Sequence, residues 1–282
     1  MEFQIAGGSV PGTDHTKPGK PGWINNQDAF HWRQTDDCLV VVVSDGCGSS
    51  MHSEFGAVMA TKILANMLIE AAEANHRSGG KVGISWDRIR KSFLAHVTVL
   101  AENMGGSFSQ TINDHFLFTI VGTVITPQKT FRFSIGDGVF VVNGTVINLG
   151  PFPNNQPPYV VYNLVESNLQ STQPELLRFK VEEIDTSLLN SLVIGTDGVL
   201  DLIALKDEHT THRGNGESEV VGDISQFWLT DSYFKNADMV RRRLAVINKE
   251  IAEVVGQNTA RVKGGPLPDD TTLVVIRRKP TA

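Results

Sequence analysis

The stretch Leu39–Ser49, LVVVVSDGCGS, joins a run of aliphatic residues directly to a short acidic segment rich in glycine. The nearly continuous valines predict a strand over residues 38–44 that is covered on both faces. Asp45 follows this strand at once, so its carboxylate is expected where a buried strand reaches the protein surface. An acidic side chain in such a place is a suitable ligand for a hard cation.

Three further acidic segments follow the same pattern: NQDA at 26–29, GTDG at 195–198 and PDDTT at 268–272. The run Ser191–Ile194 leads into Asp197, and Leu273–Ile276 follows Asp269. A single Asp-Gly pair is most often only a turn, because both residues favour turns. Four such segments, each next to a predicted strand, favour the hypothesis that their carboxylates meet in the folded protein.

The composition is that of an ordinary soluble enzyme. The chain has 282 residues, of which 40% are hydrophobic and 20% charged, so it can bury a sizeable core. A net charge of −6 argues against a protein that binds nucleic acid by neutralising phosphates. The two dense basic segments, Arg241–Arg243 and Arg277–Lys279, are expected to be solvated surface.

Several other classes of protein are disfavoured. Two cysteines, Cys38 and Cys47, are too few for a disulfide framework, and the N-terminal residues lack the pattern of a signal peptide. The longest apolar runs fall short of the roughly 20 residues that span a membrane. We therefore expect a cytoplasmic protein with no nucleic-acid or membrane partner, and the sequence leaves its oligomeric state open.

Strands and helices are predicted in blocks rather than in strict alternation. After a loop over residues 11–22, the first half of the chain carries strands, two amphipathic helices and a meander in which Asn143-Gly144 favours a type I′ turn. One helix is expected to begin at Ser53 and the other to cover residues 85–104. The expected strands cover residues 28–32, 38–44, 117–125, 130–135, 139–142 and 145–149.

The second half of the chain begins with a proline-rich loop over residues 151–158. The elements expected after it are strands at 159–164 and 176–181, a helix from Asp197 through Leu205, a polar surface excursion around residues 206–232, a long helix at 237–255 and a closing strand at 272–278. No repeat or linker divides the sequence. We therefore predict a single domain over residues 1–282 of the α+β class, with layers of antiparallel sheet and helix.

The carboxylates favour magnesium or manganese chemistry. Both ions prefer oxygen ligands, and Asp28, Asp45, Asp197 and Asp269, with the Gly46 carbonyl, are sufficient for a pair of them. Zinc motifs of closely spaced His and Cys are absent from the sequence. Two ions about 4 Å apart clamp a phosphoryl oxygen and lower the pKa of a bridging water, so hydrolysis of a phosphomonoester fits this set.

Taken together, the motifs resemble those of the PPM family of metal-dependent protein phosphatases, the type 2C serine/threonine phosphatases. The segment 26–29 is similar to the family's first acidic motif, 45–49 to its glycine-rich metal loop and 135–138 to its central Gly-Asp motif. Residues 195–201 and 269–272 resemble the two later metal motifs. The order of the motifs is more specific than any one of them.

The resemblance implies a fold, an activity and a set of ligands. The fold is an αββα sandwich of two antiparallel sheets flanked by helix pairs. The activity is hydrolysis of phosphoserine and phosphothreonine in a phosphorylated protein substrate, by a metal-bridged water. In the family pattern Asp45 bridges two Mn²⁺ or Mg²⁺ ions, Asp197 and Asp269 hold the first, Asp28 and the Gly46 carbonyl hold the second, and Asp137 with Asp201 hold a third. A register slip of one residue would put Asp270 in the place of Asp269.

Two departures from the family pattern bear on the substrate. Trp23 stands at about the place of an arginine that holds the substrate phosphate, which leaves Lys20 or Lys17 to supply a point charge. Cys47 stands where many members carry a histidine that is proposed to protonate the leaving group. His52 then becomes the candidate general acid, since it is the histidine nearest to this motif.

Two other functions are left open by the sequence. A third departure, Gln27 in place of a common acidic residue, removes one charge near the second ion. Trp23 and Cys47 favour a pseudophosphatase, a module that binds a phosphorylated partner without turning it over. A two-metal phosphodiesterase acting on nucleotides is less favoured, because the sequence carries no motif for recognising a base or a ribose.

Overall fold

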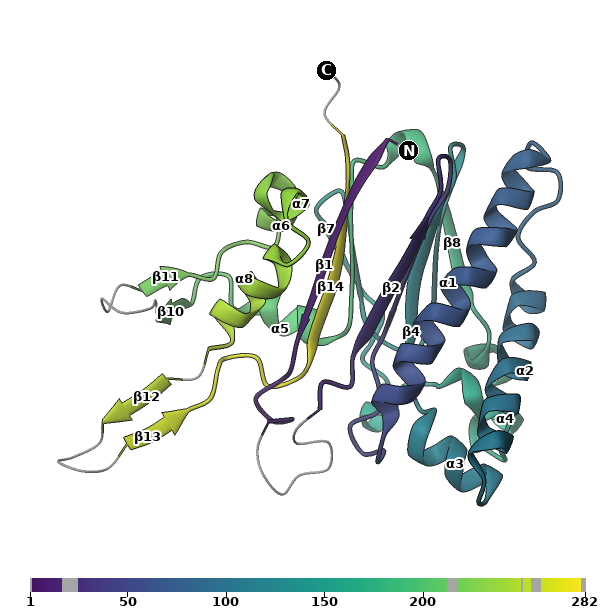
Figure 1. The fold of residues 1–282 in the computed structure, drawn as a ribbon, viewed down its shortest axis with the longest axis horizontal. Helices are drawn as coiled ribbons and strands as arrows, with labels where there is room; N and C mark the ends of the chain where they lie inside the picture. Colours follow the sequence, from purple (N-terminus) through teal and green to yellow (C-terminus); the bar gives the residue numbers. More distant parts are fainter. Residues whose placement is uncertain (1, 17–24, 212–217, 250, 255–259, 280–282) are drawn as a thin grey trace.

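The computed structural model describes residues 2–16, 25–211, 218–249, 251–254 and 260–279, which form two stacked five-stranded antiparallel sheets (Figure 1). The first sheet has the strand order β1 (Phe3–Val10), β14 (Thr271–Arg278), β9 (Ser191–Gly195), β6 (Val139–Val142), β7 (Thr145–Asn148). The second has the order β2 (Ala29–Gln34), β3 (Leu39–Ser44), β4 (Ile120–Ile125), β5 (Lys129–Ile135), β8 (Lys180–Asp185). The predicted α+β class is confirmed.

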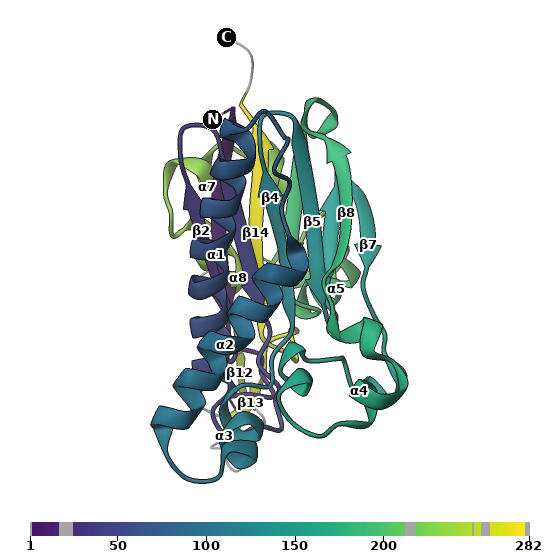
Figure 2. The ribbon, with the colours of Figure 1, turned by 90° about the vertical axis from the view of Figure 1, so that its right-hand side faces the viewer.

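Helices cover the outer face of each sheet, so that the layers run helix, sheet, sheet, helix (Figures 1 and 2). On the second sheet lie α1 (Ser53–Arg77) and α2 (Trp86–Met104), with α3 (Phe108–His115) packed against both. On the first sheet lie α5 (Gly198–Ala204), α6 (Gln226–Leu229), α7 (Ser232–Lys235) and α8 (Met239–Ile247). The predicted αββα sandwich is therefore the observed arrangement.

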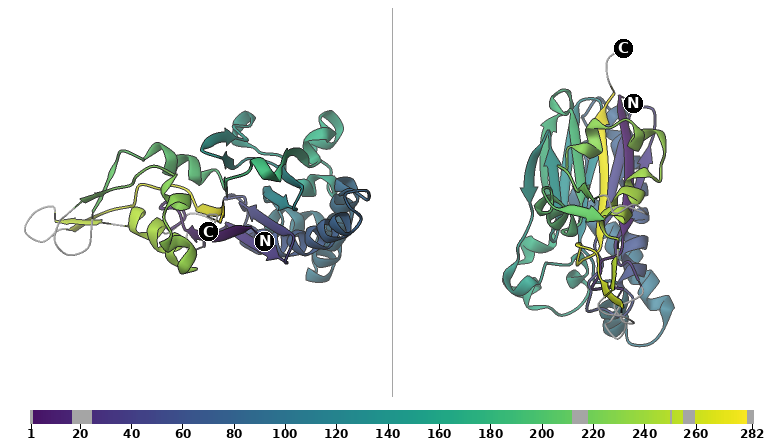
Figure 3. Two further views of the ribbon diagram at one scale, coloured as in Figure 1. Left: turned by 90° about the horizontal axis from the view of Figure 1, so that it is seen from above. Right: turned by 90° about the vertical axis from the view of Figure 1, so that its left-hand side faces the viewer.

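Two short hairpins extend away from these layers on the side of the first sheet (Figure 3). They pair β10 (His209–Thr211) with β11 (Ser218–Val220), and β12 (Ile251–Val254) with β13 (Ala260–Lys263). The first hairpin lies in the segment that the sequence predicts to be a polar surface excursion.

Strand β3 contributes to two separate apolar cores. Val40 and Val42 pack with the residues of α1 and α2, whereas Leu39, Val41 and Val43 pack in the core between the two sheets. All five side chains are fully buried. The prediction that this strand is covered on both faces is confirmed.

Helix α1 is long and apolar enough to cross a membrane, judged by its length and composition alone. In this structure it packs on β2 and β3, and half of its most apolar stretch is buried. Ala60, Leu64 and Leu68 lie at the i, i+4, i+8 spacing of one helix face and belong to the core beneath it. The apolar stripe of α1 thus covers the second sheet.

The β6–β7 hairpin has the predicted turn. Val142 pairs with Thr145, so that Asn143 and Gly144 form a two-residue loop with φ angles of 50° and 87°. Positive φ at both positions is the mark of a type I′ turn. The side chain of Asn143 also accepts a hydrogen bond from the Asn190 backbone N–H at 2.8 Å, which ties the turn to the approach to β9.

The strand predicted at residues 159–164 is wrong. These residues contain the 3-10 turn η2 (Val160–Asn163) instead. Pro158 lacks a backbone N–H that a sheet could use. Val160 and Val161 are nevertheless fully buried in the core beneath α2. A compact turn therefore buries the same apolar residues that suggested a strand.

The strand predicted at residues 176–181 is displaced. Its first residues belong to the 3-10 turn η3 (Pro174–Leu177), and β8 begins only at Lys180. Proline at the first helical position favours the turn, because its fixed φ suits a helix start. The remaining short elements are η1 (Pro153–Asn155), α4 (Asn168–Thr172) and η4 (Thr186–Leu188).

The long helix predicted at residues 237–255 is wrong in its second half, since α8 ends at Ile247. Asn248 follows it and holds two distant segments. Its side-chain amide donates to the Pro11 carbonyl at 2.9 Å, and its Oδ1 accepts from the Leu267 N–H at 2.9 Å. The apolar spacing continues past this point, but the chain there turns into the β12–β13 hairpin.

Strand β1 has no counterpart in the sequence-based prediction, and neither has α3. Gly7 and Gly8 lie inside β1 and interrupt the pattern of a strand. A Cβ at Gly8 would lie 2.3 Å from the backbone nitrogen of Arg241. Glycine at this position therefore lets α8 pack directly on the strand.

The two basic segments are only partly solvated. Arg277 donates to Asp231 at 2.7 Å, and its guanidinium carbon lies 4.1 Å from the ring centre of Phe234. Arg243 donates to Glu219 at 2.8 Å, and its side chain is only 13% exposed. The expectation of a solvated surface is wrong for Arg243 and Arg277, which fasten the segment between β11 and α8 to the body of the protein.

Candidate metal centre

In the second sheet, strand pairing brings the first two acidic segments together. Ala29 pairs with Ser44 across β2 and β3, which sets Asp28 and Asp45 at the same end of the sheet. The backbone of Asp45 is fixed there by Thr119, whose N–H donates to the Asp45 carbonyl at 2.8 Å. The predicted position of Asp45, directly after a buried strand, is what the structure has.

The remaining acidic segments lie at the same end of the first sheet. Gly195 of β9 pairs with Val139 of β6 and with Leu273 of β14. Asp137 and Asp197 lie two residues beyond these paired positions, and the terminal Asp-Asp pair directly precedes β14. All of them therefore leave the sheet at one edge.

A hydroxyl joins the two sheets at this edge. Thr196 Oγ1 donates to Asp28 Oδ2 at 2.8 Å, and it accepts from the Thr272 N–H at 3.1 Å. Thr196, which follows a strand of the first sheet, thus holds the carboxylate of Asp28, which precedes a strand of the second sheet. The two sheets share one polar centre.

The charges of the acidic side chains act on one another. Burial raises the pKa of Asp45 well above its ordinary value, and the negative charges of Asp28, Asp197, Asp269 and Asp137 raise it further. Coulomb interactions of this kind require the groups to be near neighbours in a region with little water. The four carboxylates are therefore close enough to Asp45 for their charges to act on it.

Two other members of the group show the same effect. Burial and then the charge of Asp270 raise the pKa of Asp28 well above its ordinary value. Burial and then the charges of Asp269 and Asp137 raise the pKa of Asp197 to about 7. Each of these carboxylic acids is harder to ionise than an isolated one, because its neighbours carry the same charge.

Three carboxylate oxygens in this group are buried and have no hydrogen-bond partner: Asp28 Oδ1, Asp137 Oδ1 and Asp197 Oδ1. A buried, unpaired carboxylate is costly, because it has lost water and gained no compensating charge. Divalent cations compensate such a group, and oxygen is the ligand that Mg²⁺ and Mn²⁺ prefer. The residues present therefore fit the ions that the family pattern implies.

The group is not a closed metal cage. Among the described residues, no three His, Cys, Asp or Glu side chains are arranged so that they could hold a metal ion by themselves. A tetrahedral zinc site would need such a set. Mg²⁺ instead keeps several waters and takes one or two protein carboxylates, so an open group of aspartates is what it requires.

The structure distinguishes the two aspartates of the terminal motif. Asp270 Oδ1 accepts from the Gly12 N–H at 2.7 Å and Asp270 Oδ2 accepts from the Gln27 N–H at 2.6 Å, while the side chain is 1% exposed. Both oxygens are therefore occupied by backbone groups. Asp269 has a side chain that is 47% exposed and it is the one with free acceptor capacity.

The segment after Asp45 is shaped around a glycine. A Cβ at Gly46 would lie 2.7 Å from the Gln27 carbonyl oxygen, so a larger residue does not fit. Gln27 itself is fully buried, and its side-chain amide donates to Ser53 Oγ at 2.8 Å. Ser53 in turn donates to the Cys47 carbonyl at 3.0 Å. Gln27 thus stabilises the segment at 45–49 through hydrogen bonds and contributes no charge there.

Cys47 is partly buried at the edge of the core beneath α1 and α2. Its Sγ lies 3.1 Å from Ser49 Oγ. Burial disfavours the thiolate, but hydrogen bonds from Ser49, Tyr159 and Ser50 outweigh it and lower the pKa of the thiol. Its packing agrees with a small residue that fills a tight segment.

His52 lies at the start of α1, with a side chain that is 51% exposed. Its ring stacks on His115 with centres 5.3 Å apart, and its Nδ1 lies 3.5 Å from Glu54 Oε1. The sequence-based role of His52 as general acid stays a prediction.

The two remaining candidates differ in what the structure says of them. Asp201 lies on α5, and partial burial raises the pKa of its carboxyl. Lys20, the expected phosphate contact, and Lys17 and Trp23 beside it lie outside the described residues.

Sequence reasoning overlooks His15, which lies in the loop after β1. Its Nδ1 lies 2.8 Å from Asp270 Oδ2 and its Nε2 lies 3.3 Å from Asp269 Oδ1. No motif marks this histidine, because it lies in the loop predicted over residues 11–22, which has no periodic pattern. Only the folded chain brings it to the terminal Asp-Asp pair.

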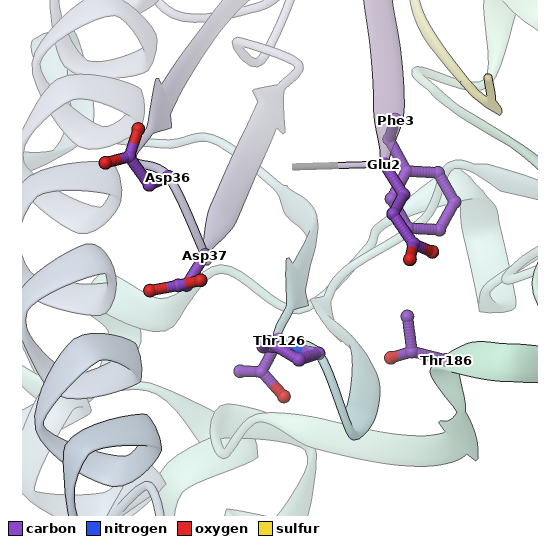
Figure 4. Close-up of a pocket in the computed structure, with 7 residues that line it drawn as sticks. Glu2, Phe3, Asp36, Asp37, Thr126 and Thr186 are labelled. Atoms are coloured by element: carbon purple, nitrogen blue, oxygen red, sulfur yellow. The ribbon is translucent and has the colours of Figure 1, made fainter.

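A second acidic hollow lies at the other end of the strands (Figure 4). It has a volume of about 230 Å³ and is lined by Glu2, Phe3, Asp36, Asp37, Thr126, Pro127 and Thr186. Glu2 pairs with Arg278, and Asp37 lies 3.6 Å from His76. Glu2 and Asp37 thus each lie beside a basic side chain.

Comparison with known proteins gives a consistent result. A sequence profile described as protein phosphatase 2C matches residues 12–224. A variant of a bacterial serine phosphatase has a TM-score of 0.53 at 12% identity, over 100% of this chain and 99% of that one. A sex-determining protein of C. elegans has a TM-score of 0.50 at 10% identity, over 99% of this chain and 66% of that one.

No curated protein matches the chain by sequence. At identities of 10–12% the structural matches show the fold alone. The family profile goes further, because it covers most of the 282 residues and includes four of the five acidic motifs, all but the one at 269–272. On this profile, and with the fold in agreement, the chain belongs to the protein phosphatase 2C family.

Proposed function

We propose that this chain is a Mn²⁺- or Mg²⁺-dependent phosphatase that hydrolyses phosphoserine and phosphothreonine monoesters in protein substrates. The observation that carries the proposal is the set of buried carboxylate oxygens without a protein partner, on Asp28, Asp137 and Asp197. The charges of these three residues also raise the pKa of Asp45. Membership of a phosphatase family supports the reaction class. The carboxylates support the dependence on divalent ions.

The proposed ligands follow from this arrangement. Asp45 lies among the others and is assigned to both ions. Asp197 and Asp269 are assigned to the first ion, and the free acceptor capacity of Asp269 favours it over Asp270. Asp28 and the Gly46 carbonyl are assigned to the second. The assignment of a third ion to Asp137 and Asp201 is supported by the unpaired Asp137 Oδ1.

When bound, the ions would neutralise the substrate phosphate and acidify a water for in-line attack on phosphorus. The residues of the chain position the carboxylates for this task. Thr196 fixes Asp28, because its hydroxyl donates a hydrogen bond to Asp28 Oδ2. Asp270 fastens the backbone of Gly12 and Gln27 to the start of β14. His52 is the proposed general acid and Lys20 the proposed contact to the phosphate.

The test is hydrolysis of p-nitrophenyl phosphate and of phosphoserine, phosphothreonine and phosphotyrosine peptides. We expect turnover with Mn²⁺ that EDTA abolishes, a preference for phosphoserine and phosphothreonine, and no turnover by Asp45→Asn. Asp36→Asn, at the far end of the sheets, is the matched control and should retain full activity. Metal-independent turnover by the wild-type protein would contradict the proposal. A preference for bis(p-nitrophenyl) phosphate would indicate a phosphodiesterase instead.

A pseudophosphatase is the second candidate, and one observation favours it. Cys47 occupies the family's histidine position, and its thiol is held by the neighbouring Ser49. A missing general acid typically costs about 10²-fold or more in rate. A protein of this kind would bind Mn²⁺ and a phosphopeptide, and would release the peptide unchanged. Calorimetry with a phosphoserine peptide, followed by mass spectrometry of the peptide, distinguishes the two functions.

A further inference from the structure

The imidazole of His15 lies between the two aspartates of the terminal motif. Its Nδ1 is 2.8 Å from Asp270 Oδ2, and its Nε2 is 3.3 Å from Asp269 Oδ1. The side chain is only 17% exposed. Each ring nitrogen therefore lies near a different carboxylate, one buried and one partly exposed.

The loop that carries His15 is fastened to the same segment. The Thr13 N–H donates to the Leu267 carbonyl at 2.9 Å, and the Asp14 N–H donates to the Pro268 carbonyl at 2.9 Å. A Cβ at Gly12 would lie 2.3 Å from a backbone carbon of Asp269, so the two backbones are in direct contact. The loop cannot shift without moving the Asp-Asp pair.

The two aspartates depend on His15 to different degrees. Asp270 is held by two backbone N–H groups and would keep its place without the ring. Asp269 accepts from one backbone group, the Asp270 N–H at 2.8 Å, and its Oδ1 also lies 3.3 Å from His15 Nε2. Loss of the ring would free Asp269 to rotate into solvent.

His15 also reaches the glycine-rich segment that follows Asp45. A Cβ at Gly48 would lie 3.6 Å from His15 Nε2, which is ordinary van der Waals contact. The ring therefore adjoins the carboxylate assigned to the first ion and the segment of the bridging aspartate. It lies between the glycine-rich segment at 45–49 and the terminal motif at 269–272.

We propose that His15 is a positioning residue that orients Asp269 toward the metal centre. The inference rests on the proposed function, because Asp269 needs a fixed orientation only if it binds an ion. Groups that orient a metal ligand typically change metal affinity about 10- to 100-fold when they are removed.

The test compares three variants of the full chain. The side-chain amide nitrogen of glutamine falls near the place of histidine Nε2, and that of asparagine near Nδ1. His15→Gln therefore retains a donor for Asp269, His15→Asn retains one for Asp270, and His15→Ala retains neither. His96→Ala is the control, since this histidine lies exposed on α2 and its Nδ1 lies 2.8 Å from the Ser92 carbonyl of the same helix.

Mn²⁺ binding is measured by electron paramagnetic resonance of the free ion, and thermal melting of the metal-free proteins is measured beside it. We expect His15→Ala and His15→Asn to bind Mn²⁺ about 10-fold or more weakly, with His15→Gln closer to wild type. The KM for p-nitrophenyl phosphate at saturating Mn²⁺ should change little. His96→Ala should match wild type in every measurement.

Three results overturn the inference and can be told apart. If wild type binds Mn²⁺ and all three His15 variants bind it equally well, then His15 has no positioning role, whatever happens to their melting temperatures. If wild type itself does not bind Mn²⁺, then the proposed function fails and the role of His15 fails with it. Equal weakening by His15→Gln and His15→Asn would also contradict the assignment, because it would point to general loosening of the loop.

Discussion

The two ends of the sandwich are both acidic, but they hold their carboxylates in different ways. At the far end Glu2 and Asp37 are largely exposed, and they pair with Arg278 and His76. At the near end Asp28 and its neighbours are buried, and several of their oxygens have no partner. Exposed ion pairs are solvated and contribute little, whereas buried unpaired charges are costly. A functional site is therefore marked here by the missing counter-charge, and acidity alone does not mark it.

The largest expected difference between the two ends is in catalysis. Asp197→Asn should lower kcat for p-nitrophenyl phosphate by roughly 10²- to 10³-fold, because the first ion, which would stabilise the developing charge on phosphate, loses a proposed ligand. Asp37→Asn, at the far end, should leave kcat within twofold of wild type. Equal losses in both variants would mean that the difference in burial has no functional meaning.

The pH dependence of stability should also separate the two ends. The pKa of Asp197 is about 7 in the folded protein and ordinarily 3.8. Because the folded state binds this proton more tightly than the unfolded state, the resulting stabilisation is full below about pH 3.8 and is lost as the pH rises to about 7. Urea unfolding of the EDTA-treated protein should give a lower midpoint at pH 8 than at pH 5.

Two controls accompany this measurement. Asp197→Asn should flatten the pH trend, and Asp37→Asn should not. Saturating Mn²⁺ should oppose the loss of stability at high pH, because metal ligands bind in their deprotonated form. A metal-free protein that becomes steadily more stable from pH 5 to pH 8 would contradict the proposed crowding of carboxylates.

A smaller effect is expected for the hydroxyl that joins the two sheets. Thr196→Val removes the hydrogen bond to Asp28 and should weaken Mn²⁺ binding by about 1–3 kcal/mol, or roughly 5- to 150-fold. Thr123→Val is the matched control, because this buried threonine lies inside β4 and donates to the Phe131 carbonyl instead of to an aspartate. Calorimetric titration with Mn²⁺ measures both. Equal affinities would show that Thr196 serves the fold only.

The smallest effect should come from the far end itself. Glu2→Gln breaks the pair with Arg278 at a side chain that is 76% exposed. Such pairs contribute about 0–1 kcal/mol, so the urea midpoint and the activity should both stay near those of wild type. A large loss of stability would show that the far end is more than a solvated surface.

Much of the fold could be predicted from the sequence because its local patterns agree with its packing. The valines of β3 are buried on both faces, and Asn143-Gly144 forms the turn that its residues favour. The failures occur where distant contacts decide. Gly8 interrupts the strand pattern of β1 because α8 packs against it, and Asn248 ends α8 because it bonds to Pro11 and Leu267.

The same distinction applies to the candidate site. Each aspartate next to an aliphatic run could be identified, since a strand end is a local feature. The choice between Asp269 and Asp270 could not be made, because it depends on the backbone of Gly12 and Gln27, which lie more than 240 positions away in the sequence. His15 carries no local signal at all, and only its place beside Asp269 suggests a role.

The most direct measurement is a crystal structure of the protein grown with Mn²⁺, with anomalous diffraction data collected at the manganese edge. We predict anomalous peaks among Asp28, Asp45, Asp197 and Asp269, with an oxygen of Asp45 nearest to both of the strongest ones. Ordered aspartates with no anomalous peak among them, or manganese bound at the Asp36 and Asp37 hollow instead, would contradict a shared metal centre.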